Sequence, residues 1–379
     1  DFINVLYSEY LTYDPQNPTW VGRDCVFLDP GHMAPMLYSQ LCLAGKFTLD
    51  ELAQLRQWGS PTTGHPEFEI ARGIENTSGP LGQGHVFAIG AAIAAKFLAS
   101  HTGNPTFSKE TIYAYISDGG IQEEISQGGA RIASVLGLDN LIMFYDSNDI
   151  QLSTETKDVM NEDTAAKYRA LGWEVIEING NDVEQIRSAI EHAKAVTGRP
   201  TLIIGKCIMG KGALKADGSS YEANCKTHGA PLGGDAYVNT VKHLGGNPEQ
   251  PFAIFDDVKE LYASRAKELA SICAERYAEE KAWAEANPEK AAAQAEWFSG
   301  KAPEIDWSKV QQKANDATRS ASAACLSALA EQVPNMICAS ADLSNSDKTD
   351  GFLKKTHDLK AGDFSGAFFQ AGVAELTMA

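Results

Sequence analysis

The segment from Tyr113 to Ile150 constrains the fold of this 379-residue chain more than any other stretch. It contains two short apolar runs that are typical of buried strands, YAYI and LIMFY, with a helix-like stretch at residues 121–136 between them. Short apolar strands separated by helices favour a parallel sheet that is covered on both faces. The segment therefore predicts an α/β fold with a doubly wound parallel sheet.

The chain on both sides of this segment continues the alternation of helices and strands. We expect helices at residues 85–100, 121–136, 162–171 and 181–196, and strands at residues 111–116, 141–145, 173–178 and 201–207. Asn181, with Glu184 three residues later, predicts a capping box at the start of the last of these helices. Residues 208–234 form a long glycine-rich connection, and loops of that length are usually functional.

The second half of the chain predicts a helical arm and the beginning of another domain. We expect a first domain at residues 1–298 with an exposed Ala/Glu/Lys-rich helical arm at 255–297, a linker at 299–308, and a second α/β domain at 309–379 with a helix at 309–331 and a strand at 335–343. The final residues, FFQAGVAELTMA, predict a helix without a cap signal. We therefore expect the second domain to be truncated and the chain to be a piece of a longer protein.

Charge and cysteine content narrow the possible functions. The formal net charge of −18 argues against non-specific binding to nucleic acid or to anionic membranes, because both require a basic surface. The seven cysteines are scattered and contain no CxxC pair. This usage is typical of a cytoplasmic enzyme with reduced thiols rather than of a disulfide framework or a zinc site.

Polar residues follow both predicted strands of the segment from Tyr113 to Ile150. Asp118 and Asn148 come directly after the two strands, and the carboxyl ends of parallel strands are where open α/β folds bind ligands. Their oxygens suit Mg²⁺ or Ca²⁺. Gly119 and Gly120 precede a helix and would let N–H groups approach a phosphate. The residues predict a metal-and-diphosphate cradle, although acidic strand ends also serve as helix caps and Glu123 would favour a helix N-terminus in either case.

Other motifs are weak when each is taken alone. The run GPLGQG, which begins at Gly79, opens a helix but does not have the dinucleotide spacing GxGxxG. His32, His65 and His228 each lie beside a glycine, and we expect them to converge on one pocket as phosphate ligands or acid–base groups. Arg319 is by default a solvated charge, and the turn that contains Ser346 is by default only a turn.

In order and spacing, these motifs resemble those of the transketolases, which are thiamine-diphosphate enzymes. The resemblance covers essentially the whole chain, through YDPQNPTWVGRDCVFLDPGH (13–32), GHPE (64–67), GIENTSGPLGQG (73–84), KTHGAPLG (226–233) and AGVAEL (371–376). It implies the thiamine-diphosphate-binding fold and the transfer of a two-carbon ketol unit from a ketose phosphate to an aldose phosphate in the pentose phosphate pathway. It also implies a homodimer with its active site at the subunit interface.

The resemblance assigns cofactor-binding roles to individual positions. A divalent metal, Mg²⁺ or Ca²⁺, would be held by the Asp118 carboxylate, the Asn148 amide and the main-chain carbonyl of Ile150. Positions that match those around the diphosphate and the thiazolium ring are His32, Gly79, Leu81, Gly119 and His228.

It also assigns residues to catalysis and to the substrate. Glu375 matches the carboxylate that pairs with the aminopyrimidine ring of the cofactor, and Glu123 would face that carboxylate across the dimer. His65 matches a histidine at the substrate hydroxyls, and His228 lies near the reacting centre. Arg319 and Ser346 match ligands of the sugar phosphate, for which a guanidinium offers bidentate geometry.

Some features depart from the family pattern and leave alternatives open. SDGG replaces the usual GDG, and GHM replaces GHG. Family segments that contribute substrate and ring contacts would precede Asp1 and follow Ala379, so we expect the 379-residue chain alone to bind no cofactor tightly and to be inactive. A dihydroxyacetone synthase-like enzyme and a non-catalytic half of a split transketolase are the alternatives. A Rossmann dehydrogenase is disfavoured because no GxGxxG follows a strand.

Overall fold

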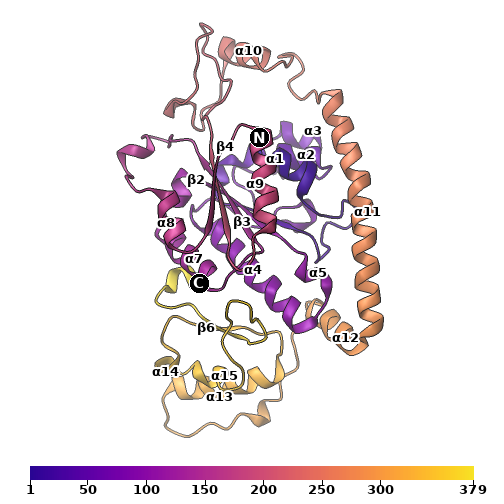
Figure 1. Cartoon of the computed structure of the whole chain (residues 1–379), viewed down its shortest axis with the longest axis vertical. Helices are drawn as coiled ribbons and strands as arrows, with labels where there is room; N and C mark the ends of the chain where they lie inside the picture. Colours follow the sequence, from indigo (N-terminus) through magenta and orange to yellow (C-terminus); the bar gives the residue numbers. More distant parts are fainter.

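A parallel sheet of five strands forms the centre of the larger part of the molecule in the computed structural model, which describes residues 1–379 (Figure 1). The strands are β1 (Cys25–Leu28), β2 (Ile112–Ser117), β3 (Leu141–Ser147), β4 (Glu174–Asn179) and β5 (Thr201–Lys206). Their order in the sheet is β1-β2-β3-β5-β4, and every neighbouring pair is parallel. Strands β2 to β5 match the predicted strands, whereas β1 was not predicted.

Helices cover both faces of this sheet, which confirms the doubly wound architecture. On one face, α4 (Gln83–Thr102) and α7 (Glu124–Val135) pack against the alternate residues Ile112, Ala114 and Ile116 of β2. On the other face, α1 (Phe2–Val5) and α9 (Val183–Ala195) pack on the side that carries Tyr113 and Tyr115. Because both faces are buried, β2 is an unbroken apolar run rather than an alternating one.

The remaining elements of this part are shorter. They are a π-helical turn at Leu6–Tyr10, α2 (Ala34–Leu43), α3 (Leu49–Ala53), α5 (Pro105–Ser108), α6 (Asp118–Gln122), α8 (Thr164–Ala170), α10 (Gly234–His243) and 3₁₀ turns at Gly31–Met33, Ile70–Arg72, Thr156–Asp158 and Cys225–Thr227. The helix predicted at 121–136 is broken at Glu123, where ψ is 137°.

The capping box predicted at Asn181 and Glu184 is wrong. The N-cap of α9 is Asp182, whose carboxylate accepts hydrogen bonds from the backbone N–H groups of Glu184 and Gln185. The side chain of Asn181 lies one residue outside the helix and donates to the Asp1 carboxylate instead. The next residue is the better cap because its carboxylate reaches two free N–H groups and favours the positive helix end.

The helical arm consists of α11 (Asp256–Ala286) and α12 (Pro288–Trp297), which run along one side of the sheet in Figure 1. Most of the arm is exposed, as predicted, but one stripe of α11 is buried. Tyr262 and Leu269 join the core beneath the N-terminal segment, and the guanidinium of Arg265 donates to the carbonyl of Leu11 at 2.9 Å. Composition alone did not reveal this narrow apolar stripe.

The C-terminal residues form a smaller unit around a two-stranded parallel sheet, β6 (Cys338–Ser340) and β7 (Phe368–Gln370). Its helices are α13 (Thr318–Gln332), α14 (Ser344–Asp347), α15 (Asp350–Leu353) and α16 (Glu375–Met378), preceded by a 3₁₀ turn at Trp307–Lys309. The helix predicted from residue 309 begins only at Thr318. The closing helix is also partly wrong, because Phe368 is fully buried in β7 and only the last residues are helical.

Two properties of the whole chain bear on its function. All seven cysteines are free thiols. None of the helices combines the length and the apolar character that a membrane span requires.

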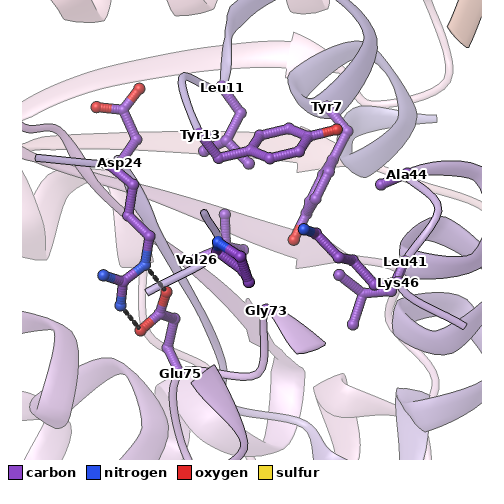
Figure 2. A pocket seen from close by; sticks show the side chains of 12 residues that line it. Tyr7, Leu11, Tyr13, Asp24, Val26, Leu41, Ala44, Lys46, Gly73 and Glu75 are labelled. Atoms are coloured by element: carbon purple, nitrogen blue, oxygen red, sulfur yellow. Dashed lines mark hydrogen bonds and ion pairs between the residues drawn. The ribbon is translucent and has the colours of Figure 1, made fainter. Parts of the chain in front are cut away.

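A buried ion pair supports the segment that leads into the GPLGQG turn. The Arg23 guanidinium donates to Glu75 through Nε at 3.0 Å and Nη2 at 2.7 Å, and the two side chains are only 12% and 8% exposed. Figure 2 shows Glu75 beside a cavity of about 30 Å³ that Tyr7, Tyr13 and Lys46 also line. Removing one member of such a pair leaves an uncompensated buried charge.

Glu75→Ala is therefore expected to lower the free energy of unfolding by about 3–5 kcal/mol, as urea denaturation would measure. Glu67→Ala, at an exposed glutamate in the preceding loop, is the matched control and should change it by less than about 0.5 kcal/mol. Equal losses for the two variants would contradict this account of the ion pair.

Candidate functional site

A cavity of about 590 Å³ lies at the carboxyl ends of β2 and β3. Its walls come from these strand ends, from the turn after β1 and from the long connection after β5. Seven of the residues singled out in the sequence line it: His32, Leu81, Asp118, Gly119, Asn148, Ile150 and His228. The position matches the rule that open α/β sheets bind ligands at the carboxyl ends of their strands.

Asp118 is held firmly at the floor of this cavity. Its side chain is buried, and Oδ1 accepts a hydrogen bond from the Tyr145 hydroxyl at 2.6 Å. Oδ2 accepts from the backbone N–H groups of Asn148 and Asp149, each at 3.1 Å. Burial raises the pKa of Asp118, and the hydrogen bonds from Tyr145 and Asn148 oppose that rise.

Asn148 is oriented by its neighbours on both ends of the amide. Its Nδ2 donates to Asp146 Oδ1 at 3.1 Å, and its Oδ1 accepts from the Ile150 N–H at 3.1 Å. The carboxylate of Asp118, the amide oxygen of Asn148 and the carbonyl of Ile150 thus offer an all-oxygen donor set at one end of the cavity. Such a set fits Mg²⁺ or Ca²⁺, which prefer oxygen ligands.

Nitrogen- or sulfur-rich metal sites are not part of this structure. The chain contains no group of three or more His, Cys, Asp or Glu side chains arranged to hold a metal.

The glycine-rich turns pack against each other too closely for side chains. A Cβ on Gly119 would lie 2.8 Å from Leu81 Cδ1, so the turn after β2 contacts the GPLGQG turn directly. A Cβ on Gly31 would lie 2.7 Å from the Gly79 nitrogen and 2.8 Å from His65 Cδ2. These close approaches place Gly79 and His65 next to the segment that carries His32, although neither lines the cavity itself.

Sequence reasoning missed Asp29, which organises the GPLGQG turn. The carboxylate is fully buried and accepts from the N–H groups of Gly82 at 3.2 Å and Gly84 at 3.0 Å, and it contacts His85 Nδ1 at 3.0 Å. It therefore satisfies free N–H groups at the start of α4 from a different element. An acidic residue at the end of the apolar run VFL was the available signal.

Of the three glycine-flanked histidines that we expected in one pocket, His32 and His228 line the cavity and His65 does not. The rings of His32 and His228 stack with their centroids 4.8 Å apart, and His65 approaches the same segment at Gly31. Burial, followed by the nearby His228 and His65, lowers the pKa of His32 from 6.5 to about 4. His32 is therefore neutral at physiological pH.

The lowered pKa of His32 makes the stability of the protein depend on pH. Between about pH 6.5 and pH 4 the unfolded chain takes up a proton at this position and the folded chain does not, so stability falls as the pH falls. In the unmodified protein, His32 lowers the free energy of unfolding as the pH falls. We expect His32→Gln to reduce this decrease by about 1–2 kcal/mol, since partial solvent exposure weakens the effect. Urea denaturation at pH 7 and pH 4.5 would measure it. The control is His243→Gln, at an exposed histidine. If both variants lost the same unfolding free energy between pH 7 and pH 4.5, or if His32→Gln lost more, the prediction would be contradicted.

The structure does not bring Glu375 to this cavity. Glu375 is exposed at the start of α16, which packs on α7 through the Thr377 hydroxyl and the Ile125 carbonyl at 3.4 Å. Glu123 packs against Gly82 and, together with Leu81 and residues 376–379, lines a second cavity of about 840 Å³. Arg319 and Ser346 are exposed on α13 and α14 and line neither cavity.

A family model and several known proteins are similar to this chain. The model of the transketolase thiamine diphosphate binding domain matches residues 1–303. Transketolase 1 of Vibrio cholerae is 37% identical over 393 aligned positions, which cover 100% of this chain and 57% of that protein. The chloroplastic transketolase-1 of Arabidopsis thaliana is 39% identical over 91% of this chain and 47% of its own length.

Solved structures agree with these relatives. A transketolase from Leishmania mexicana superposes with a TM-score of 0.91 at 34% identity, over 99% of this chain and 56% of that one. A transketolase from Pichia stipitis in complex with sedoheptulose 7-phosphate gives a TM-score of 0.89 at 34% identity, with the same coverage. The chain spans about half the length of the relatives it matches.

Proposed function

Because this chain belongs to the transketolase family, we propose that it binds thiamine diphosphate with Mg²⁺ or Ca²⁺ and serves the transfer of a two-carbon ketol unit between sugar phosphates. One observation carries the proposal: an all-oxygen donor set and a glycine turn border the same cavity as two histidines. The free cysteines favour a reducing compartment such as the cytoplasm. A transfer between sugar phosphates would place the protein in the pentose phosphate pathway.

The proposed roles follow from the chemistry of each group. Asp118, Asn148 and the Ile150 carbonyl hold the metal, and the Gly119 N–H donates to the diphosphate. His32, Leu81 and His228 would form the walls around the diphosphate and the thiazolium ring, and Gly79 would support them through its close approach to Gly31. When bound, thiamine diphosphate supplies the electron sink that allows a carbon–carbon bond beside a carbonyl to break.

The substrate side of the site requires a second subunit. Glu375 is exposed and does not line its own cavity, so we propose that it reaches the aminopyrimidine ring bound by the partner in a homodimer, beside Glu123. There Glu375 would hold the proton that the ring exchanges. His65 would contact the substrate hydroxyls, and His228 would lie beside the reacting carbon. Arg319 and Ser346 would bind the sugar phosphate.

Calorimetric titration with thiamine diphosphate tests this proposal, on a protein that contains this chain and has the full length of its relatives. We expect one cofactor per chain to bind in the presence of Mg²⁺ and no binding in EDTA, because the metal links the diphosphate to Asp118 and Asn148. Absence of binding with Mg²⁺ would contradict the proposed site. Acceptor assays with an aldose phosphate and with formaldehyde would then distinguish a transketolase from a dihydroxyacetone synthase.

A further inference from the structure

Two tyrosines form hydrogen bonds between β2 and β3, and each hydroxyl donates to a carboxylate beside the cavity. These strands lie next to each other in the sheet, with Ser117 opposite Asp146 in register. The hydroxyl of Tyr145, on β3, donates to Asp118 at 2.6 Å, directly after β2. The hydroxyl of Tyr115, on β2, donates to Asp146 at 2.6 Å, near the end of β3. Each strand therefore supplies the donor that holds the carboxylate of the other.

The two contacts approach the strand ends from opposite faces of the sheet. Tyr145 belongs to the core that includes Ile112 and Ile116, whereas Tyr115 belongs to the core that includes Phe144. Both rings are at least nine-tenths buried, at 3% and 6% exposure, so neither can turn toward solvent. Each hydroxyl is positioned by the packing of its own ring.

The two contacts act on different ligand side chains of the proposed metal site, one directly and one through an intermediate residue. Tyr145 acts directly on Asp118. Tyr115 acts through Asp146, whose other oxygen accepts from Asn148 Nδ2 at 3.1 Å and so directs the amide oxygen of Asn148 away from Asp146. Hydrogen bonds to the ligands of a metal fix their orientation, and their loss typically weakens metal binding 10–100-fold.

Burial alone does not account for these contacts. Tyr168, on α8, is also fully buried and packs edge-on against Trp173, yet its hydroxyl makes no hydrogen bond. Burial of a tyrosine in this fold therefore does not by itself bring its hydroxyl to a carboxylate. At Tyr115 and Tyr145, by contrast, both hydroxyls reach carboxylates beside the same cavity.

We propose that Tyr115 and Tyr145 are positioning residues that set the affinity and the Mg²⁺/Ca²⁺ preference of the Asp118–Asn148 site; this inference rests on the metal-binding function proposed above. Mg²⁺ requires nearly ideal octahedral geometry, whereas Ca²⁺ accepts a flexible shell of six to eight oxygens. Freeing either ligand side chain should therefore weaken Mg²⁺ binding more than Ca²⁺ binding. A purely structural role of the tyrosines would give no such difference between the ions.

The test measures dissociation constants for Mg²⁺ and Ca²⁺ by calorimetry, with saturating thiamine diphosphate. Tyr145→Phe removes one hydroxyl and keeps the ring, and we expect about 10–100-fold weaker Mg²⁺ binding with a smaller loss for Ca²⁺. Tyr115→Phe should act in the same direction. The control Tyr168→Phe, at the unpartnered buried tyrosine, should leave both constants unchanged.

Three results would overturn the inference. Mg²⁺ affinity in Tyr145→Phe and Tyr115→Phe equal to that of Tyr168→Phe would show that the hydroxyls do not position the ligands. Equal losses for Mg²⁺ and Ca²⁺ would show a general structural defect. If the unmodified protein bound neither ion in the presence of the cofactor, the proposed metal site itself would be wrong, and this inference would fall with it. Should Tyr145→Phe not fold, Tyr115→Phe carries the same comparison.

Discussion

Asp118→Ala is expected to abolish metal-dependent binding of thiamine diphosphate. Asp118 is the only carboxylate in the proposed donor set, and Mg²⁺ sites in proteins depend on one or two carboxylates together with ligand phosphates. The substitution also frees the Tyr145 hydroxyl and the N–H groups of Asn148 and Asp149, which the carboxylate now holds in place. Calorimetry in the presence of Mg²⁺ should show at least about a 100-fold loss of cofactor affinity.

The control for this prediction is Asp257→Ala, at an exposed aspartate in the first turn of α11. It removes the same charge from a chain of net charge −18 and should leave cofactor binding unchanged. Cofactor affinity in Asp118→Ala that equals that of Asp257→Ala would mean that the metal lies elsewhere.

Glu375→Gln is expected to slow the chemistry without weakening metal binding. If Glu375 holds the proton that the aminopyrimidine ring exchanges, the neutral amide cannot perform that role, and proton transfer by a positioned side chain typically contributes 10²–10⁴-fold. The exchange of the thiazolium C2 proton of bound cofactor for deuterium should slow by about this factor. Nuclear magnetic resonance of quenched samples measures the exchange rate directly.

Glu275→Gln, at an exposed glutamate on α11, is the matched control. Its C2 exchange rate should equal that of the unmodified protein. The Mg²⁺ affinity should be the same in the unmodified protein, in Glu375→Gln and in Glu275→Gln. A C2 exchange rate unaffected by Glu375→Gln would remove this residue from the catalytic assignment.

Local pattern predicted the buried strands but not the elements that depend on distant partners. Strands β2 and β3 are long apolar runs, so their character is visible without knowing their neighbours. By contrast, β7 has three residues and lies in a stretch of helical appearance, and it is a strand because Phe368 pairs with Cys338 of β6. The four residues of β1 escaped notice for the same reason.

The candidate site likewise contains residues that the sequence predicts and residues that only the tertiary structure identifies. Asp118, Gly119, Asn148 and the histidines stand out because their residue types and spacing are informative in the chain itself. Tyr115 and Tyr145 did not, because an aromatic residue in a buried strand is ordinarily a core residue. Their contacts follow from the parallel register of β2 and β3 and from which face each ring occupies, neither of which is visible in a linear pattern.

The most direct test of the metal-and-diphosphate site is a crystal structure of the protein grown with thiamine diphosphate and Mn²⁺, with data collected for the anomalous signal of manganese. The account predicts one anomalous peak per chain, bounded by the Asp118 carboxylate, the Asn148 amide oxygen and the Ile150 carbonyl, with the diphosphate beside Gly119. A manganese peak at any other position, or a cofactor bound without metal at Asp118, would contradict it.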